Sequence, residues 1–464
     1  MAPVPHDRLK MHVYDSKLGI SAQRRICVFI PIVACVYAEI VSPLLMYVTP
    51  GESIMAPRVE NKIFWPALAA ISVILAIRNW SKLAFPPHII LLFAYLALAG
   101  ASVLWAFKPE FSLSRLLLQL TIVTSIVLPA IASPRTAEMM RGVFLCFAFA
   151  SILNVFFVLN QTPIYLENVS IGYPGYFPFK GLLGECAAMA FVLSLHEILY
   201  PGGRRALGII VIAVATYLMV LSESKGSLGL ALIAPVLAGL TMIIVKALRI
   251  SPAIVLLPIP ICYAVLSHLL SGNLVNRISY LIYGNYTLSG RTFIWDFAES
   301  EIARRPLFGW GYQSFWLVGP DAPSIVDAPG WIKTMPSSHN GYLDTMLDTG
   351  YVGLVLLIAF IFTTLHAIGR VADRDLARAW LLLSLALFVI LVNFLESTWM
   401  HGMDMLWLIF AVVAAETGRH WRPVHPGGLV SEPIRWGPVI AGRRPGLARA
   451  GGANGPTRYQ NKRT

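Results

Sequence analysis

Two side chains in the polar stretch 271–350 carry the chemistry needed to hold a phosphate and to move a proton. Arg291 follows Ser-Gly at the start of a predicted helix, and a guanidinium can hold phosphate oxygens through paired donors. His339 lies in Ser-Ser-His-Asn, and an imidazole, which titrates near neutral pH, can take a proton from a hydroxyl group. Each also has a plainer interpretation, as an arginine that reaches from an apolar surface into water or as a hydrogen-bonded surface histidine.

Other ionisable residues lie in or beside short turns between apolar segments. Lys225 lies in Ser-Glu-Ser-Lys-Gly-Ser, where an ionisable side chain is usually functional unless, together with Glu223, it is simply solvated. Lys180 and Glu185 lie near the end of an apolar segment and are similar but weaker candidates. His401, between the last two apolar segments, is the alternative base to His339.

The remaining acidic residues are weaker candidates still. Asp344 and Asp348 lie one helical turn apart and can simply solvate an outer face, while Glu39 and Glu396 are isolated acids within or at the end of apolar segments. The polar stretch has no Asp-x-Asp, no cysteine cluster and no His-x-x-x-His. We therefore expect no metal and no other cofactor.

The elements that must position these residues are membrane helices. The chain has 464 residues, of which 57% are hydrophobic and 13% charged, and its mean hydropathy is +0.68. This composition predicts an all-α polytopic membrane protein with about 12 transmembrane helices. The predicted spans are 26–48, 63–79, 88–107, 115–133, 140–159, 178–199, 205–221, 227–247, 252–270, 351–369, 379–396 and 399–416.

The distribution of Lys and Arg predicts the orientation of these spans. An even number of spans puts both termini on one side, and 25 of the 36 Lys and Arg residues fall on that side. The positive-inside rule then places both termini in the cytoplasm and the stretch 271–350 outside. The net charge of +12 thus follows mainly from topology and gives no argument for nucleic-acid binding.

The chain is therefore expected to have five parts. Residues 1–25 form a cytoplasmic segment, residues 26–270 the first nine spans, residues 271–350 a large outer loop, and residues 351–416 the last three spans. The basic tail 417–464 is rich in Gly, Pro and Arg, which predicts disorder and contact with anionic lipid headgroups.

Within the outer loop, hydrophobic periodicity predicts two helices. The first covers 291–305, lies on the membrane surface and is ended by Pro306. Residues 316–338 show no periodicity. The second helix starts near His339 and stops at Gly350.

Three motif blocks in this loop resemble those of the O-antigen polymerase/ligase superfamily of bacterial envelope glycan enzymes. The blocks are S-G-R-x-x-x-W, R-P-x-x-G-x-G-x-x-x-F and H-N-x-x-L-x-x-x-x-x-G-x-x-G-L. The resemblance covers roughly 290–355, and the wording His-Asn-Gly-Tyr-Leu-Asp is most similar to the exopolysaccharide polymerase branch. The matching residues are Ser289-Gly290-Arg291 with Trp295, Arg305-Pro306 with Gly309, Gly311 and Phe315, and His339-Asn340 with Leu343, Gly350 and Gly353.

This resemblance implies a GT-C-like helical fold in the bacterial inner membrane. It also implies transfer of a glycan from an undecaprenyl diphosphate carrier on the periplasmic face, so the bilayer and other polysaccharide export proteins are implied partners. The acceptor would be a carrier-linked repeat unit in a polymerase or lipid A core in a ligase. A lipid-linked glycan transporter or flippase is the alternative from another functional class.

The resemblance also implies roles for individual residues. His339 would activate the acceptor hydroxyl, and Arg291 would hold the diphosphate leaving group. Lys225 stands where relatives often have arginine, and it keeps the charge but loses the paired donors. The residues that would support them are Arg305, Asn340, Lys180 and His401.

Overall fold

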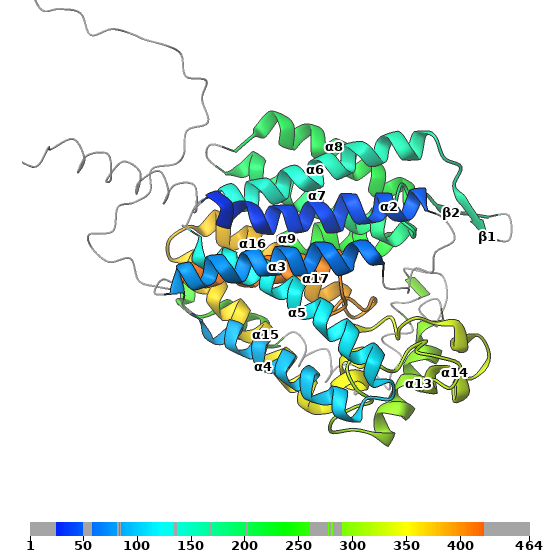
Figure 1. Cartoon of the computed structure of the whole chain (residues 1–464). Coiled ribbons are helices and arrows are strands. Elements are labelled where there is room, and N and C mark those ends of the chain that lie inside the picture. Colours follow the sequence, from blue (N-terminus) through cyan, green and yellow to red (C-terminus); the bar gives the residue numbers. More distant parts are fainter. Residues whose placement is uncertain are drawn as a thin grey trace, which may run out of the picture. The chain divides into compact units, whose positions relative to one another are not determined.

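The computed structural model describes the helical part of the chain, which is predominantly α-helical (Figure 1). Residues 1–24, most of the tail, the later part of the predicted span 252–270 and nearly all of the loop before Gly290 lie outside the described residues. The described residues are 25–49, 58–80, 83, 85–133, 137–166, 169–200, 203–258, 277, 280–281 and 290–421.

Among these residues, eight helical stretches are long and apolar enough to cross a membrane. They match eight of the predicted spans, and the chain is therefore a polytopic helical membrane protein in this coarser sense, while the number 12 stays a prediction. The eight are Arg25–Val48 (with η1, Tyr37–Val41, and α2, Ser42–Val48), α3 (Val59–Arg78), Pro87–Trp105 (α4, Pro87–Ser102, with η3, Val103–Trp105), α5 (Pro109–Ala132), α6 (Glu138–Leu159), α7 (Lys180–Leu199), α9 (Lys225–Leu248) and α15 (Gly341–Ala372).

Four shorter helices fall at the other four predicted spans. Helices α8 (Arg205–Leu221) and α16 (Leu376–Val392) are shorter and apolar, and α10 (Pro252–Leu256) is the described start of the predicted span 252–270. Helix α17 (Met405–Arg419) begins six residues after the predicted start at 399, because Asp404 caps it by accepting hydrogen bonds from the backbone N–H of Leu406 and Trp407.

Short elements outside the bundle were not all expected. An antiparallel hairpin of β1 (Ile164–Leu166) and β2 (Val169–Gly172) joins α6 to α7, and the all-α prediction lacks it. The stretch without periodicity contains α14 (Pro323–Val326) and the 3-10 turn η4 (Gly330–Thr334).

The first loop helix, α13 (Arg291–Arg304), has its apolar face buried inside the loop. Ile294 and Phe297 pack in a small hydrophobic cluster with Trp310, Phe315 and Leu347. The outward-facing Phe293 is exposed. The apolar face that suggested a surface helix therefore serves mainly to build a core for the loop.

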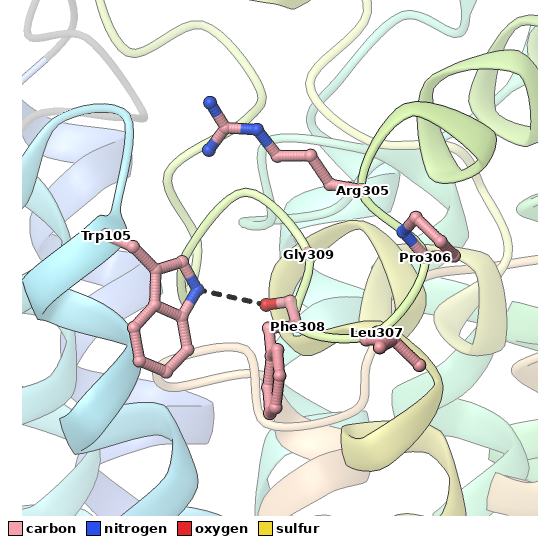
Figure 2. Close-up of a pocket in the computed structure, with 6 residues that line it drawn as sticks. All are labelled: Trp105, Arg305, Pro306, Leu307, Phe308 and Gly309. Atoms are coloured by element: carbon pink, nitrogen blue, oxygen red, sulfur yellow. Dashed lines mark hydrogen bonds between the residues drawn. The ribbon is translucent and has the colours of Figure 1, made fainter.

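The loop after α13 is attached to the end of α4. Figure 2 shows the side chain of Trp105 donating a hydrogen bond to the carbonyl oxygen of Phe308, with an N···O distance of 3.1 Å. The Ser102 hydroxyl also accepts from the backbone N–H of Tyr312 at 2.9 Å. Figure 1 accordingly shows α13 and α14 at the end of the bundle where α4 ends and α5 begins.

A glycine ends the second loop helix, as the sequence pattern predicts. Gly350 has φ 68° and ψ −167° inside α15, so the helix breaks there before continuing as an apolar span. This backbone conformation is essentially restricted to glycine. A Cβ atom at Gly350 would also overlap the backbone of Leu307 and Phe308.

We expect Gly350→Ala to destabilise the protein by about 1–3 kcal/mol from backbone strain alone. The midpoint of thermal unfolding in detergent measures this effect. Gly229→Ala is the matched control, since Gly229 lies inside α9 and has no heavy atom within 4 Å of its would-be Cβ. Equal midpoints for the two variants would contradict the strain argument.

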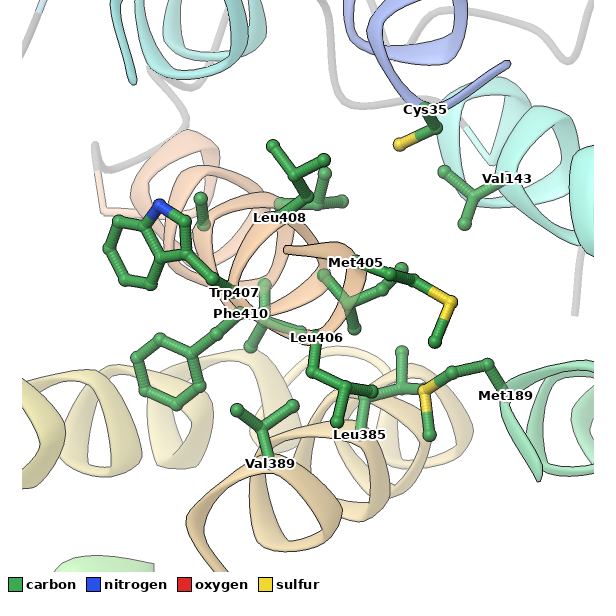
Figure 3. Packing of buried hydrophobic residues seen from close by; sticks show 14 of the residues in the cluster. Cys35, Val143, Met189, Leu385, Val389, Met405, Leu406, Trp407, Leu408 and Phe410 are labelled. Atoms are coloured by element: carbon green, nitrogen blue, oxygen red, sulfur yellow. The ribbon is translucent and has the colours of Figure 1, made fainter. Parts of the chain in front are cut away.

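Helix α17 lies in the middle of the bundle. Every one of its residues, from Met405 to Arg419, is buried. Figure 3 shows its side chains pointing to several sides, with Leu406 directed toward Leu385 and Val389 of α16. Since no face of α17 is left for lipid, its 15 residues are held by van der Waals packing against other helices.

Candidate functional site

Three ionisable side chains from three separate segments meet in one cluster. The Glu396 carboxylate accepts a hydrogen bond from Nη2 of Arg291 through Oε1 at 2.6 Å. Its other oxygen, Oε2, lies 2.9 Å from Nδ1 of His339. All three side chains are partly exposed. The structure thus brings together the two residues that the sequence singles out, through an acid that it ranks among the weakest candidates.

Helix α13 places Arg291 beside the His339 turn. Arg291 is the first residue of α13 and follows Gly290, whose φ of 89° turns the chain into the helix. One turn later, Nε1 of Trp295 donates to the carbonyl oxygen of Ser338 at 3.1 Å. The Arg and Trp of the first motif block therefore both face the segment that carries His339.

The His339 turn is held from both sides. His339 itself has φ 51°. On one side, the backbone N–H of Ser338 donates to Oδ1 of Asp344 at 3.1 Å. On the other, Asn340 caps α15, because its Oδ1 accepts from the backbone N–H of Tyr342 and Leu343 at 3.1 and 3.2 Å. The side chain of Asn340 is thus engaged in supporting the turn.

The interpretation of Asp344 and Asp348 as solvating residues is wrong. Both side chains are buried, with 3% and 6% of their surface exposed. Asp344 also accepts a hydrogen bond from Nε1 of Trp316 at 2.9 Å. The periodicity of α15 is correct, but the loop 310–317 folds over the face that carries the acids, and Asp344 holds that loop to the His339 turn.

Glu396 lies in a turn that is hydrogen-bonded to the start of α15. The backbone N–H of Gly341 donates to the carbonyl oxygens of Asn393 and Glu396 at 2.9 and 3.1 Å. The backbone N–H of Asn340 donates to the Ser397 hydroxyl at 3.0 Å. The predicted span ran to 396, whereas α16 ends at Val392. The four residues 393–396 therefore belong to the turn, although the sequence pattern predicts them, and with them Glu396, inside a helix.

We expect Glu396→Gln to lower the rate of the reaction in which His339 takes part by about 10²-fold, because the carboxylate partner of the imidazole is lost. Without the carboxylate, the His339 ring loses the partner that holds its Nδ1 in place. Glu299→Gln, at an exposed position of α13, is the control. An unchanged rate in Glu396→Gln would contradict a role for this carboxylate.

Two further titratable groups lie in the same turn. His401 is partly buried, and this burial lowers its pKa, while the Asp344 charge partly offsets the effect. Burial also raises the pKa of Asp404 to about 7, although its two capping hydrogen bonds oppose this shift. Among the residues that the structure describes, His401 forms no hydrogen bond or ion pair with Arg291, Glu396 or His339, so it stays a separate alternative base.

The raised pKa of Asp404 predicts how stability depends on pH. Between about pH 4 and 7 the folded protein keeps a proton that the unfolded chain has released, so stability should fall as the pH rises through this window. Asp404→Asn keeps a capping oxygen and should flatten this dependence. Melting temperatures at pH 4.5 and 7.5 measure this pH dependence, and Asp373→Asn, at an exposed position, is the control. If the stability of Asp404→Asn fell with pH as steeply as that of the wild type, Asp404 would not be the group responsible.

The remaining candidates lie elsewhere. Arg305 is exposed, and its guanidinium stacks on the Trp310 ring at 4.3 Å from the centroid. Lys180 and Lys225 are the first residues of α7 and α9. These two helices begin side by side, since a Cβ at Gly184 would lie 2.5 Å from the Cβ of Ser224. Across the described ranges, no group of three or more His, Cys, Asp or Glu side chains could hold a metal ion.

Comparisons with known proteins find similarity to enzymes and proteins of bacterial polysaccharide synthesis. Residues 208–358 match the family model described as O-antigen ligase. A stretch of 302 residues is 24% identical to the exopolysaccharide production protein ExoQ of Rhizobium meliloti, and it covers 61% of this chain and 66% of that protein. A stretch of 87 residues is 26% identical to a putative polysaccharide ligase of Rickettsia conorii, covering 18% and 21%.

These matches confirm the resemblance to the O-antigen polymerase/ligase superfamily that the motif blocks predict. The family match includes Arg291 and His339 but stops before Glu396. The chain spans just under two thirds of the length of the exopolysaccharide relative and about a fifth of the length of the ligase relative.

Proposed function

We propose that this protein is an inner-membrane glycosyltransferase that polymerises exopolysaccharide or O-antigen repeat units on the periplasmic face, using an undecaprenyl-diphosphate-linked donor. The observation that carries the proposal is the Glu396 carboxylate, which joins Arg291 and His339 at 2.6 and 2.9 Å. The O-antigen ligase match and the relatives named for exopolysaccharide production and polysaccharide ligation support it.

His339 is the proposed general base. Its Nδ1 is paired with Glu396, so the neutral ring carries its proton on Nδ1 and presents the lone pair of Nε2 to an acceptor hydroxyl. As the hydroxyl oxygen forms its bond to the anomeric carbon of the donor, Nε2 takes the proton. Glu396 positions the ring and stabilises the imidazolium that results.

Arg291 is the proposed ligand of the leaving group. The bond between the anomeric carbon and the diphosphate oxygen breaks, and the diphosphate leaves with the bonding electron pair. Nε of Arg291 is buried and has no hydrogen-bond partner within the described chain. A buried donor left unpaired is costly, and a diphosphate oxygen would satisfy it while the guanidinium stabilises the developing charge. The proton on His339 then passes to the released diphosphate.

The other candidates would act around this centre. Lys225 would add positive charge for the diphosphate, and Lys180 and His401 would contact the substrates from neighbouring turns. No metal or other cofactor is required by this reaction. The positive-inside rule supports cytoplasmic termini and a periplasmic site, with the bilayer and polysaccharide export proteins as surroundings.

A ligase that attaches the glycan to lipid A core is the second candidate, favoured by the description of the matching family. Product analysis in a strain lacking this protein tests both. A polymerase predicts single repeat units on the carrier, whereas a ligase predicts full-length polymer that stays on the carrier and is missing from lipid A core. Normal polymer correctly attached in that strain would refute both.

A further inference from the structure

An open pocket of about 530 Å³ lies between the end of α4 and the loop after α13. Its size is within the range of about 300–1,000 Å³ that is usual for ligand pockets. Figure 2 shows the Trp105 and Phe308 rings on one side and the Arg305 guanidinium above them. The residues that line it are Trp105, Arg305, Pro306, Leu307, Phe308 and Gly309.

The apolar side of this pocket is a built surface. Trp105 donates its indole hydrogen bond to the Phe308 carbonyl, and the two rings meet edge to face at a centroid distance of 5.7 Å. Beside them Leu104 is 87% and Leu307 is 60% exposed. So large an exposed apolar area at a helix end suits contact with a lipid chain more than contact with water.

The polar side of the pocket is formed by the Arg305 guanidinium. The Cζ atom of Arg305 lies over the Trp310 ring, 4.3 Å from its centroid, and no residue that the structure describes accepts a hydrogen bond from the guanidinium. A stacked guanidinium keeps its in-plane donors available for phosphate oxygens. An apolar wall beside such a cation fits an amphiphile with an isoprenoid chain and a diphosphate head.

The pocket lies along α15 from the Arg291–Glu396–His339 cluster. The backbone N–H of Trp310 donates to the carbonyl oxygen of Leu347 at 2.7 Å. Arg291 is the first residue of α13 and Arg305 follows its last residue, so the two cations lie fourteen residues apart in the chain, which is about 21 Å along the helix axis. The pocket is therefore separate from the diphosphate position at Arg291 and yet within reach of a short oligosaccharide.

We propose that this pocket holds the carrier lipid of the acceptor, with its isoprenoid chain against Trp105 and Phe308 and its diphosphate on Arg305. The inference rests on the proposed polymerase function, in which two carrier-linked glycans are bound at once. The attacking hydroxyl belongs to the sugar end of the acceptor, so the lipid end of that molecule must lie away from the donor diphosphate. A second amphiphile site displaced along α15 meets this requirement.

The number of bound carrier molecules tests the inference. The full chain in zwitterionic nanodiscs is titrated with farnesyl diphosphate, and the stoichiometry is measured by native mass spectrometry. Wild type is expected to bind two molecules, and Arg305→Ala and Arg291→Ala one each. Arg304→Ala, which removes a neighbouring exposed charge paired with Asp327, is the control and should bind two. Phe308→Ala keeps the carbonyl that Trp105 contacts and should weaken the second site about tenfold.

Each deviation has its own meaning. Two molecules bound to Arg305→Ala would overturn the pocket assignment. Two molecules bound to Arg291→Ala would instead overturn the proposed donor site and leave the pocket standing. Displacement of the second molecule by an equal concentration of phosphatidylglycerol would show a general phospholipid site and overturn the inference. Equal displacement by inorganic diphosphate would do the same, because the isoprenoid chain would then contribute nothing.

Discussion

Replacing His339 with alanine is expected to lower glycan transfer by a factor of about 10²–10⁴, the usual contribution of a general base. The loss should appear in the turnover rate more than in the affinity for the donor, since the imidazole acts on the acceptor hydroxyl in the transition state. A purified enzyme supplied with a carrier-linked glycan, with chain growth followed by gel or mass spectrometry, gives this measurement. Correct membrane insertion of the variant is checked in parallel.

Two other histidines provide the comparison for this experiment. His366 is exposed on α15 and bonds to the hydroxyl of Ser251, so His366→Ala should keep full activity. His401→Ala tests the alternative base. If His401→Ala abolished transfer while His339→Ala retained it, the assignment of the base would have to be reversed.

Replacing Arg291 with alanine is expected to reduce transfer by about 10²–10³, the loss typical of one donor that stabilises developing charge. Arg291→Lys should recover only part of this, because lysine supplies the charge without the planar pair of donors. The same chain-growth assay measures both variants. Donor binding should weaken as well, since the leaving diphosphate carries charge before the reaction.

The Arg291 variants also remove the partner of Glu396, so a matched control is needed. Arg304→Ala lies in the same helix and removes an ion pair with Asp327, and it should leave transfer unchanged. Lys225→Ala should cause a smaller loss than Arg291→Ala. Full activity in Arg291→Ala, with normal insertion, would exclude the proposed role in holding the leaving group.

The sequence predicts those features of the site that depend on local pattern. The helix that begins at Arg291, the break at Gly350 and the family resemblance all follow from residue types at fixed spacing. The structure adds a physical reason for Gly309, which the sequence shows only as a motif residue, and for Gly350, which it shows as a helix end. At both positions the backbone of the loop lies against the backbone of α15, with no room for a side chain.

Features that depend on tertiary packing could not be predicted in this way. Glu396 ranks as a weak candidate because a mainly apolar stretch runs up to it, and its place in a turn follows only from the end of α16 at Val392. The burial of Asp344 and Asp348 likewise depends on a loop folding over them. A single sequence contains no local signal for such a fold-back.

The central position of α17 has a consequence for how this protein is made. Of the helices that the structure describes, α17 is the last along the chain and is buried on every side, and Glu396 precedes it by only nine residues. Because synthesis runs from the N-terminus, Glu396 and α17 are made after all the other described helices. Until then the growing chain lacks both its central helix and the Glu396 carboxylate of the site. We expect truncated chains to be inactive and to be recognised by membrane proteases, which ties the onset of activity to the end of synthesis.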